Sequence, residues 1–161
     1  MSYSIRRLTG LLVALLLACP AMGGESPGLD VRELADQAIA LSRHIDVLED
    51  PQQSLTLADV QSTEHANRFK PVTEPDRQLG FGITDSAYWL RLRLHNSSAA
   101  PVAAMLEITY PRLGQLDFHV LSAEGHMLSS KTGHLLPFSE RPYTHHMLVF
   151  PIQLPAHGTP S

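Results

Sequence analysis

The segment Gly80–Asn96 (GFGITDSAYWLRLRLHN) constrains the fold most strongly, because its second half alternates between two kinds of side chain. One set is mainly apolar and consists of Tyr88, Leu90, Leu92 and Leu94. The other set is cationic and aromatic and consists of Trp89, Arg91, Arg93 and His95. Successive side chains of a β-strand point to opposite faces, so the pattern predicts a two-faced strand. We expect the leucine face to lie in the core. The other face is either a ligand-binding surface or a solvated one.

The same alternation recurs further along the chain, with turn signals between the segments. Additional strands are expected over 45–50, 104–110, 115–120, 127–130 and 147–154. Pro151 cannot donate a ladder hydrogen bond, so the last of these strands belongs at an edge or a bulge. Short strands at regular spacing, without intervening helices, indicate an all-β fold. The leading hypothesis is an antiparallel β-sandwich with jelly-roll connectivity.

Ahead of the strands, the sequence predicts short helical segments. Asp30 and Glu33 form a start similar to a capping box, and apolar residues then recur near helical spacing, which predicts a helix over 31–42. Thr56 and Asp59 predict one further capped helical turn. The fold expected is therefore a β-sandwich with a short N-terminal helix.

The N-terminus has the features of an export signal. Arg6 and Arg7 precede the apolar run Leu8–Ala18, and small residues follow in Ala21-Met22-Gly23. The run is well short of the roughly 20 residues that span a bilayer, so removal is expected rather than permanent anchoring. Residues 1–23 are predicted to be a signal peptide, which directs the mature chain to the periplasm.

Cys19 is the only cysteine, and it bears on how the N-terminus is processed. A lipoprotein is an alternative, because Leu16-Leu17-Ala18-Cys19 loosely resembles a lipobox. Cleavage after Gly23 would instead leave no thiol, so no disulfide is expected. The remaining length suits one domain, with a helical lead-in over 24–44 and a β-sandwich over 45–161.

An ordered set of short motifs accompanies the strand pattern. The set comprises Val47-Leu48-Glu49-Asp50-Pro51, Leu55–Val60, Phe69-Lys70-Pro71, Tyr88-Trp89-Leu90-Arg91, Tyr110-Pro111-Arg112-Leu113, Gly133, residues 137–142 and Phe150–Pro155. In this order it resembles the 7TM-DISM extracellular sensor domain, type 2, over Ile45–Pro155. The resemblance implies a periplasmic jelly roll similar to carbohydrate-binding modules. In that family the domain precedes a seven-helix membrane region and a signalling output such as a histidine kinase or a diguanylate cyclase.

The chain departs from the family pattern in two respects. It has no membrane region or output domain, and it stops at Ser161, where the family continues into at least one further strand. A sandwich without its closing strand exposes an unpaired edge. We therefore expect a truncated fragment, and a non-signalling remnant of a longer receptor is one alternative.

Polar side chains on three predicted strands and one loop are the candidate ligand-binding residues: Trp89, Arg91, Arg93, Glu107, Asp117, His119 and Arg141. Sugars stack on aromatic rings and hydrogen-bond through their hydroxyls, and arginine also suits carboxylates. The hypothesis is that Trp89 stacks, the arginines donate and the acids accept, binding a carbohydrate or a small organic acid. Two alternatives stay open: a solvated face with cross-strand ion pairs, and a Trp89 packed in the core beneath a helix or loop.

The remaining function classes are disfavoured. A net charge of −4 without a basic run outside the signal argues against nucleic acid. The nine histidines show no HxH, HxxxH or HExxH spacing, and there is no GxSxG motif, so no metal, cofactor or enzymatic activity is expected. Glu107 and Asp117 could also act as the two carboxylates of a glycosidase. This hypothesis is weaker than that of a binding site without catalysis, because neighbouring arginines would neutralise both acids. The alternative to a small-molecule ligand is an interaction module that pairs with another periplasmic domain or a second copy of the chain.

Overall fold

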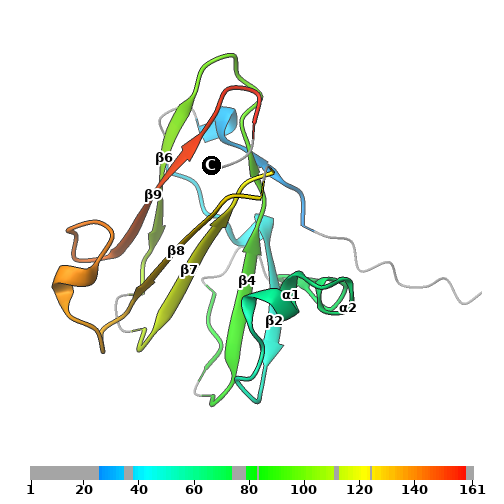
Figure 1. Ribbon diagram of the computed structural model, residues 1–161, viewed down its shortest axis with the longest axis vertical. Coiled ribbons are helices and arrows are strands. Elements are labelled where there is room, and N and C mark those ends of the chain that lie inside the picture. The colour runs from blue at the N-terminus through cyan, green and yellow to red at the C-terminus, as the bar shows by residue number, and fades with distance from the viewer. Residues whose placement is uncertain are drawn as a thin grey trace, which may run out of the picture.

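The computed structural model describes residues 26–34, 38–73, 79–82, 84–110, 113–123 and 125–158. The predicted signal peptide and Cys19 lie outside these residues. Strands predominate and helices are short, which confirms a β-rich fold (Figure 1). The sandwich and jelly-roll connectivity remain predictions.

The strands are β1 (Leu29–Asp30), β2 (Ile45–Asp50), β3 (Lys70–Pro71), β4 (Ala87–Leu92), β5 (Leu94–His95), β6 (Val102–Ile108), β7 (Leu116–Leu121), β8 (Met127–Thr132) and β9 (Leu148–Leu154). The helical elements are η1 (Val31–Leu34), η2 (Ser42–His44), α1 (Leu57–Gln61), α2 (Thr63–Ala66) and η3 (Phe138–Glu140). Strand β2 lies between β3 and β4 and is antiparallel to both. Antiparallel pairing also joins β6 to β9 and β7 to β8, whereas β1 and β5 are parallel.

The helix expected over 31–42 does not form as one element. Its described part contains the 3-10 turn η1, non-helical backbone at 38–41, and only then η2. Val31 is buried in the core, but Ala38 is exposed, Ile39 is 38% exposed and Leu41 is only half-buried, so the apolar residues at 38–41 find little to pack against. A short helix without a packed face is marginal in water, which accounts for the wrong prediction.

The capped turn at Thr56 is confirmed as the start of α1. The Asp59 backbone amide donates to the Thr56 hydroxyl (3.3 Å), and the Asp59 carboxylate accepts from the Thr56 amide (2.8 Å). This reciprocal box satisfies amides that the first helical turn otherwise leaves unpaired. Helices α1 and α2 lie beside β2 and β4 (Figure 1).

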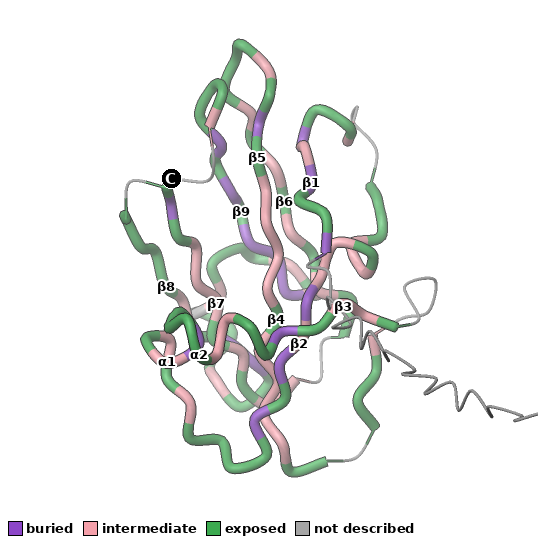
Figure 2. The backbone as a smooth tube through the Cα atoms, turned by 90° about the vertical axis from the view of Figure 1, so that its right-hand side faces the viewer, coloured by how far each residue is buried: buried purple, intermediate pink, exposed green. Residues whose placement is uncertain are grey.

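Among the described residues, two groups of buried side chains form part of the core. One joins Leu48, Val60 and Phe69, so α1 packs against β2. The other is centred on β9, with the buried residues Val31, Ile152 and Leu154. Figure 2 shows that β1, β2 and β9 carry much of the buried chain. The rings of Phe150 and Phe118 stack with their centroids 4.1 Å apart, which packs β9 against β7.

The long strand is divided, and its leucine face is not a continuous core face. Pairing changes at Arg93, where β4 ends before β5 begins beside β1. Leu94 packs against the core around β9, as expected, but Leu90 is 47% exposed. The prediction of a buried leucine face is therefore wrong at Leu90. The cause is tertiary: α1 packs on the opposite face of the sheet, where Leu48 and Trp89 lie.

The position of Pro151 agrees with the sequence prediction. Pro151 lies opposite Met105 in the β6–β9 ladder, and β9 pairs only with β6 among the strands that the structure describes. A proline is tolerated in such a strand because the missing amide does not interrupt a second ladder.

Candidate functional site

An open groove of about 950 Å³ lies beside the β3-β2-β4 sheet. It is lined by Val47, Leu48, Glu49, Asn67, Arg68, Lys70, Pro71, Val72, Thr73, Leu79, Gly80, Phe81 and Tyr88. The register explains the location, because Val47 pairs with Lys70, and Glu49, two residues further along β2, pairs with Tyr88. Side chains two residues apart on a strand share a face, so these groups project on the side of the sheet opposite Leu48 and Trp89.

Phe81 and Tyr88 form an aromatic wall of the groove. Their rings are stacked, with centroids 3.9 Å apart and an interplanar angle of 11°. Between them the chain passes through Gly82, whose φ of +69° is favourable for glycine and strained for other residues. Phe81 remains 38% exposed, so part of its surface is open to a ligand.

Glu49 fixes the polar end of this wall. Its Oε1 accepts hydrogen bonds from the Ser86 hydroxyl (2.7 Å) and the Tyr88 hydroxyl (3.2 Å). Because Glu49 and Tyr88 are directly opposed in the β2–β4 ladder, both the backbone and the side chain hold the phenol in place. The acid therefore already has partners within the protein.

Two cations, Arg68 and Lys70, line the groove and are exposed. The Arg68 amide closes the end of α2 by donating to the His65 carbonyl (2.9 Å), and the backbone of Lys70 belongs to β3. No carboxylate of the described residues forms an ion pair with either side chain. Within the described part of the chain, neither charge is neutralised by an ion pair.

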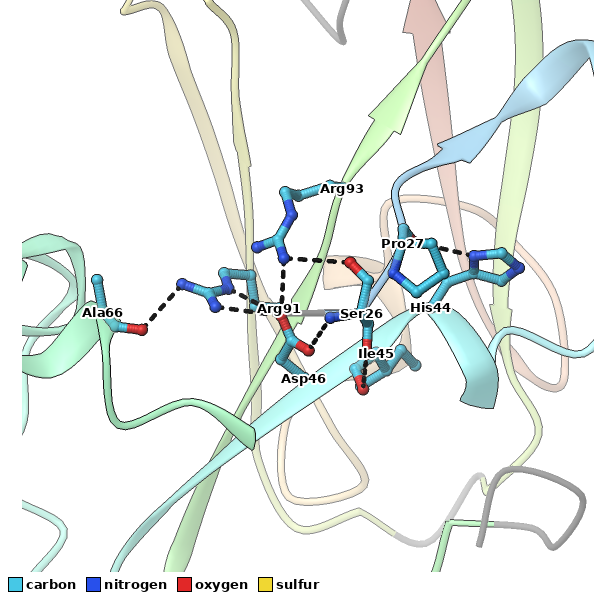
Figure 3. A network of polar contacts seen from close by, with 8 residues as sticks. All are labelled: Ser26, Pro27, His44, Ile45, Asp46, Ala66, Arg91 and Arg93. Carbon is cyan, nitrogen blue, oxygen red and sulfur yellow. Dashed lines mark hydrogen bonds and ion pairs between the residues drawn. The ribbon is translucent and has the colours of Figure 1, made fainter. Parts of the chain in front are cut away.

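On the opposite face, Asp46 is the centre of a buried ionic network (Figure 3). Its carboxylate accepts from the Ser26 amide (2.7 Å), from Arg91 Nη2 (3.1 Å) and from Arg93 Nη2 (3.1 Å). Asp46 is only 1% exposed. Burial opposes its ionisation, but the hydrogen bonds from Ser26 and the positive charges of the two arginines outweigh this effect and lower the pKa of Asp46.

Three of the candidate ligand-binding residues, Trp89 and Arg91 in β4 and Arg93 just after it, make contacts within the protein. Arg91 also donates to the Ala66 carbonyl (3.3 Å), and its guanidinium lies 4.3 Å from the centre of the Phe69 ring. Arg93 donates to the Ser26 carbonyl (3.2 Å). Trp89 packs against the buried group of Leu48, Val60 and Phe69. Trp89 therefore packs against the core beside a helix, as one alternative held. The arginines form ion pairs with the buried Asp46, whereas the other alternative expected cross-strand pairs on a solvated face.

His119 is the one remaining candidate that the structure brings close to Trp89. The two rings are nearly parallel, at 16°, with centroids 6.4 Å apart. His119 Nδ1 lies 2.8 Å from the Ser129 hydroxyl across the β7–β8 ladder. The pair links β7 to β4 by an aromatic contact.

The other candidates lie in separate places. Asp117 forms an ion pair with Lys131 (3.2 Å), and Glu107 is exposed on β6 opposite Val149. Arg141 donates to the carbonyls of residues 145 and 146 (2.7 and 3.1 Å) and lies 4.6 Å from the centre of the Phe138 ring. None of the seven candidate residues lines the groove.

Within the described ranges, no three His, Cys, Asp or Glu side chains are arranged to hold a metal ion together. Over the same part of the chain, no helix is long and apolar enough to cross a membrane. The suggested carboxylate pair, Glu107 and Asp117, lies on strands of different sheets, β6 and β7. Of the two acids, Asp117 is already paired with a cation.

The sequence did not single out the residues that line the groove as a site. Two signals pointed toward it: the glycines flanking Phe81, and Lys70 within the motif Phe69-Lys70-Pro71. Neither signal links Phe81 to Lys70, because their proximity depends on β2 pairing with β3 on one side and β4 on the other. Periodicity within a single strand carries no information about that arrangement.

Comparison with known proteins identifies the family. The family model described as 7TMR-DISM extracellular 2 matches residues 42–160, which include β2 through β9, the groove and Asp46 with its two arginine partners. No curated protein and no solved structure matches the chain significantly. The family match covers most of the 161 residues and confirms the resemblance found in the sequence motifs. The chain therefore belongs to the 7TMR-DISM extracellular 2 family, the extracellular sensor domains of membrane receptors.

Proposed function

We propose that this protein is a periplasmic ligand-binding sensor domain and that a carbohydrate or a small organic acid occupies the groove on the β3-β2-β4 sheet. The observation that carries the proposal is the groove itself. It combines the stacked rings of Phe81 and Tyr88 with two cations that have no carboxylate partner among the described residues. The proposed activity is binding without catalysis.

The composition of the groove suits a ligand with an apolar face and polar edges. The volume of about 950 Å³ is within the range of small-molecule sites. Phe81 and Tyr88 offer apolar surface, and Asn67, Arg68 and Lys70 offer hydrogen-bond donors. A sugar ring or a planar organic acid uses both kinds of contact.

The groove also gives a physical basis for sensing. Its walls come from three parts of the chain: the β2 strand, the segment 67–73, and the segment 79–82 with β4. A ligand that contacts all three stabilises their arrangement relative to one another. A receptor responds to such a ligand only to the extent that the ligand binds one signalling state more tightly than the other.

A second candidate function is strand addition at β8. Among the described strands, β8 pairs only with β7, and Met127 and Leu128 at its start are 54% and 62% exposed. An unpaired edge with exposed apolar residues is a surface to which another strand can add.

Thermal unfolding in the presence of ligands tests the two functions. A ligand that binds only the folded state stabilises the full chain by about 2.7 kcal/mol at a concentration of 100 times Kd, which raises Tm. We expect sugars or organic acids to raise Tm, and Phe81→Ala to remove the shift. Leu135→Ala is the control, because Leu135 is 73% exposed and does not line the groove. No shift with any ligand, together with dimerisation that depends on concentration, would favour strand addition instead.

A further inference from the structure

We infer that the ligand of the groove is acidic and belongs to the class of carboxylate-bearing sugars, the uronates. The inference rests on the proposed function, because it assumes that the groove binds a ligand. It goes beyond that function by assigning the charge of the ligand and the residues that select it.

The charge follows from the pairing of the groove residues. Arg68 and Lys70 are exposed, line the same groove, and have no carboxylate within ion-pair distance in the described chain. The acid that lines the groove, Glu49, already accepts two hydrogen bonds through Oε1. Two cations in one concave site attract an anion more strongly than the same charges on a flat surface, because low-dielectric walls focus the field.

The kind of anion follows from the rest of the lining. A guanidinium can bind a carboxylate through two parallel hydrogen bonds, and an ammonium adds a compact positive charge. The stacked Phe81 and Tyr88 rings supply apolar surface that a small inorganic anion cannot use. A molecule that uses both parts of the site has a carboxylate and a ring with an apolar face.

The distance between the cation Lys70 and the aromatic wall suits one sugar ring. Lys70 on β3 and Tyr88 on β4 lie on either side of β2 and on the same face of the sheet. Two ladder spacings separate their strands, roughly 10 Å between backbones. An interval of this size accommodates a pyranose ring, with its apolar face toward the aromatic wall and a carboxylate at the edge nearer Lys70.

The expected preference is moderate, because both cations are exposed. Partly solvated ion pairs each change affinity by a few-fold, so the two together favour a uronate over the matching neutral sugar by about tenfold. The preference falls as ionic strength rises, because salt screens exposed charges.

Matched pairs of sugars give a direct test. Glucuronate and glucose, and galacturonate and galactose, differ in the carboxylate at C6. Calorimetric titration into the full chain at low salt is expected to give a Kd about tenfold lower for each uronate than for its neutral partner. The difference shrinks at high salt, and acetate, which has the charge without the ring, binds more weakly than either uronate.

Variants locate the effect in the groove. The double variant Arg68→Gln/Lys70→Gln is expected to bind uronates and neutral sugars with equal affinity, because glutamine keeps a hydrogen-bond donor but removes the positive charge. The control is Arg32→Gln/Lys131→Gln, which changes the net charge equally at exposed positions outside the groove and keeps the preference.

The outcomes separate the inference from the function on which it rests. Equal affinity for uronates and neutral sugars, or a uronate preference that survives in Arg68→Gln/Lys70→Gln, overturns the acidic-ligand inference while groove binding stands. Acetate binding as tightly as glucuronate overturns the sugar assignment. If neither a sugar nor an organic acid such as acetate binds, or if Phe81→Ala leaves all binding unchanged, the proposed function fails and the inference fails with it.

Discussion

Replacement of Asp46 by alanine is the sharpest test of how this fold is held together. The carboxylate is 1% exposed and accepts from the Ser26 amide and from two guanidinium groups, those of Arg91 and Arg93. Asp46→Ala removes all of these acceptors at once. It removes the Ser26–Asp46 hydrogen bond between the N-terminal segment and β2, so that among the described residues only the bond from the Ser26 hydroxyl to the Ile45 carbonyl (3.1 Å) remains there, and it leaves two neighbouring cations without their counter-charge (Figure 3).

The size of the effect follows from burial. Removal of one partner from a buried ion pair costs about 3–5 kcal/mol, because the remaining charge is left uncompensated. The side chains of Arg91 and Arg93 are 23% and 36% exposed, and each keeps a backbone carbonyl acceptor. Water and these carbonyls offset part of the loss, so we expect about 3 kcal/mol. For a domain of this size, this corresponds to a fall in Tm of roughly 10 °C.

Equilibrium unfolding in urea measures the change. The midpoint is expected to fall while the slope m stays the same, because the loss of stability does not require a change in the surface exposed on unfolding. The matched control is Asp117→Ala. Asp117 also forms an ion pair, with Lys131 at 3.2 Å, but their side chains are 32% and 68% exposed. An exposed pair contributes at most about 1 kcal/mol, so the control changes stability far less.

One result would contradict this expectation for Asp46. If Asp46→Ala costs no more than Asp117→Ala, the buried network does not anchor the N-terminal segment. Burial would then be a poor guide to the energetic importance of this carboxylate.

Three further predictions follow from the same structure. Because the pKa of Asp46 lies below its ordinary value of 3.8 in the folded protein, the stability that this carboxylate contributes is present at neutral pH and is lost as pH falls from about 4 through the lower folded pKa. The free energy of unfolding measured against pH should therefore show less acid dependence in Asp46→Ala. Phe150→Ala should cost about 3–5 kcal/mol in urea unfolding, because it leaves a cavity and removes the stack on Phe118, and a loss below about 1 kcal/mol would contradict this packing. Gly133→Ala should destabilise by more than about 1 kcal/mol, because φ is +144° and a Cβ would overlap the Gly114 carbonyl; an unchanged Tm would refute that geometry.

The sequence predicted most strands correctly because alternation is a local signal. The period of two placed β4, β6, β7 and β9, and the reciprocal pairing of Thr56 with Asp59 placed the start of α1. The same motifs, in order along the chain, identified the family, and the family match confirmed it. The helix predicted over 31–42 did not form as one element, because the apolar residues at 38–41 lack a packed partner.

Tertiary structure decided which face of each strand is buried and which residues meet. Alternation divides the side chains of β4 into two sets, but it does not say which set a helix will cover. Packing of α1 against Leu48 and Trp89 buried one face of the sheet; on the other face Leu90 is exposed and Tyr88 lines the open groove. The groove itself depends on β3 and β4 flanking β2, a long-range pairing between segments that no local pattern connects. The sequence by itself thus determined the strands and the family, whereas the packing of helices on sheets decided where a ligand has access.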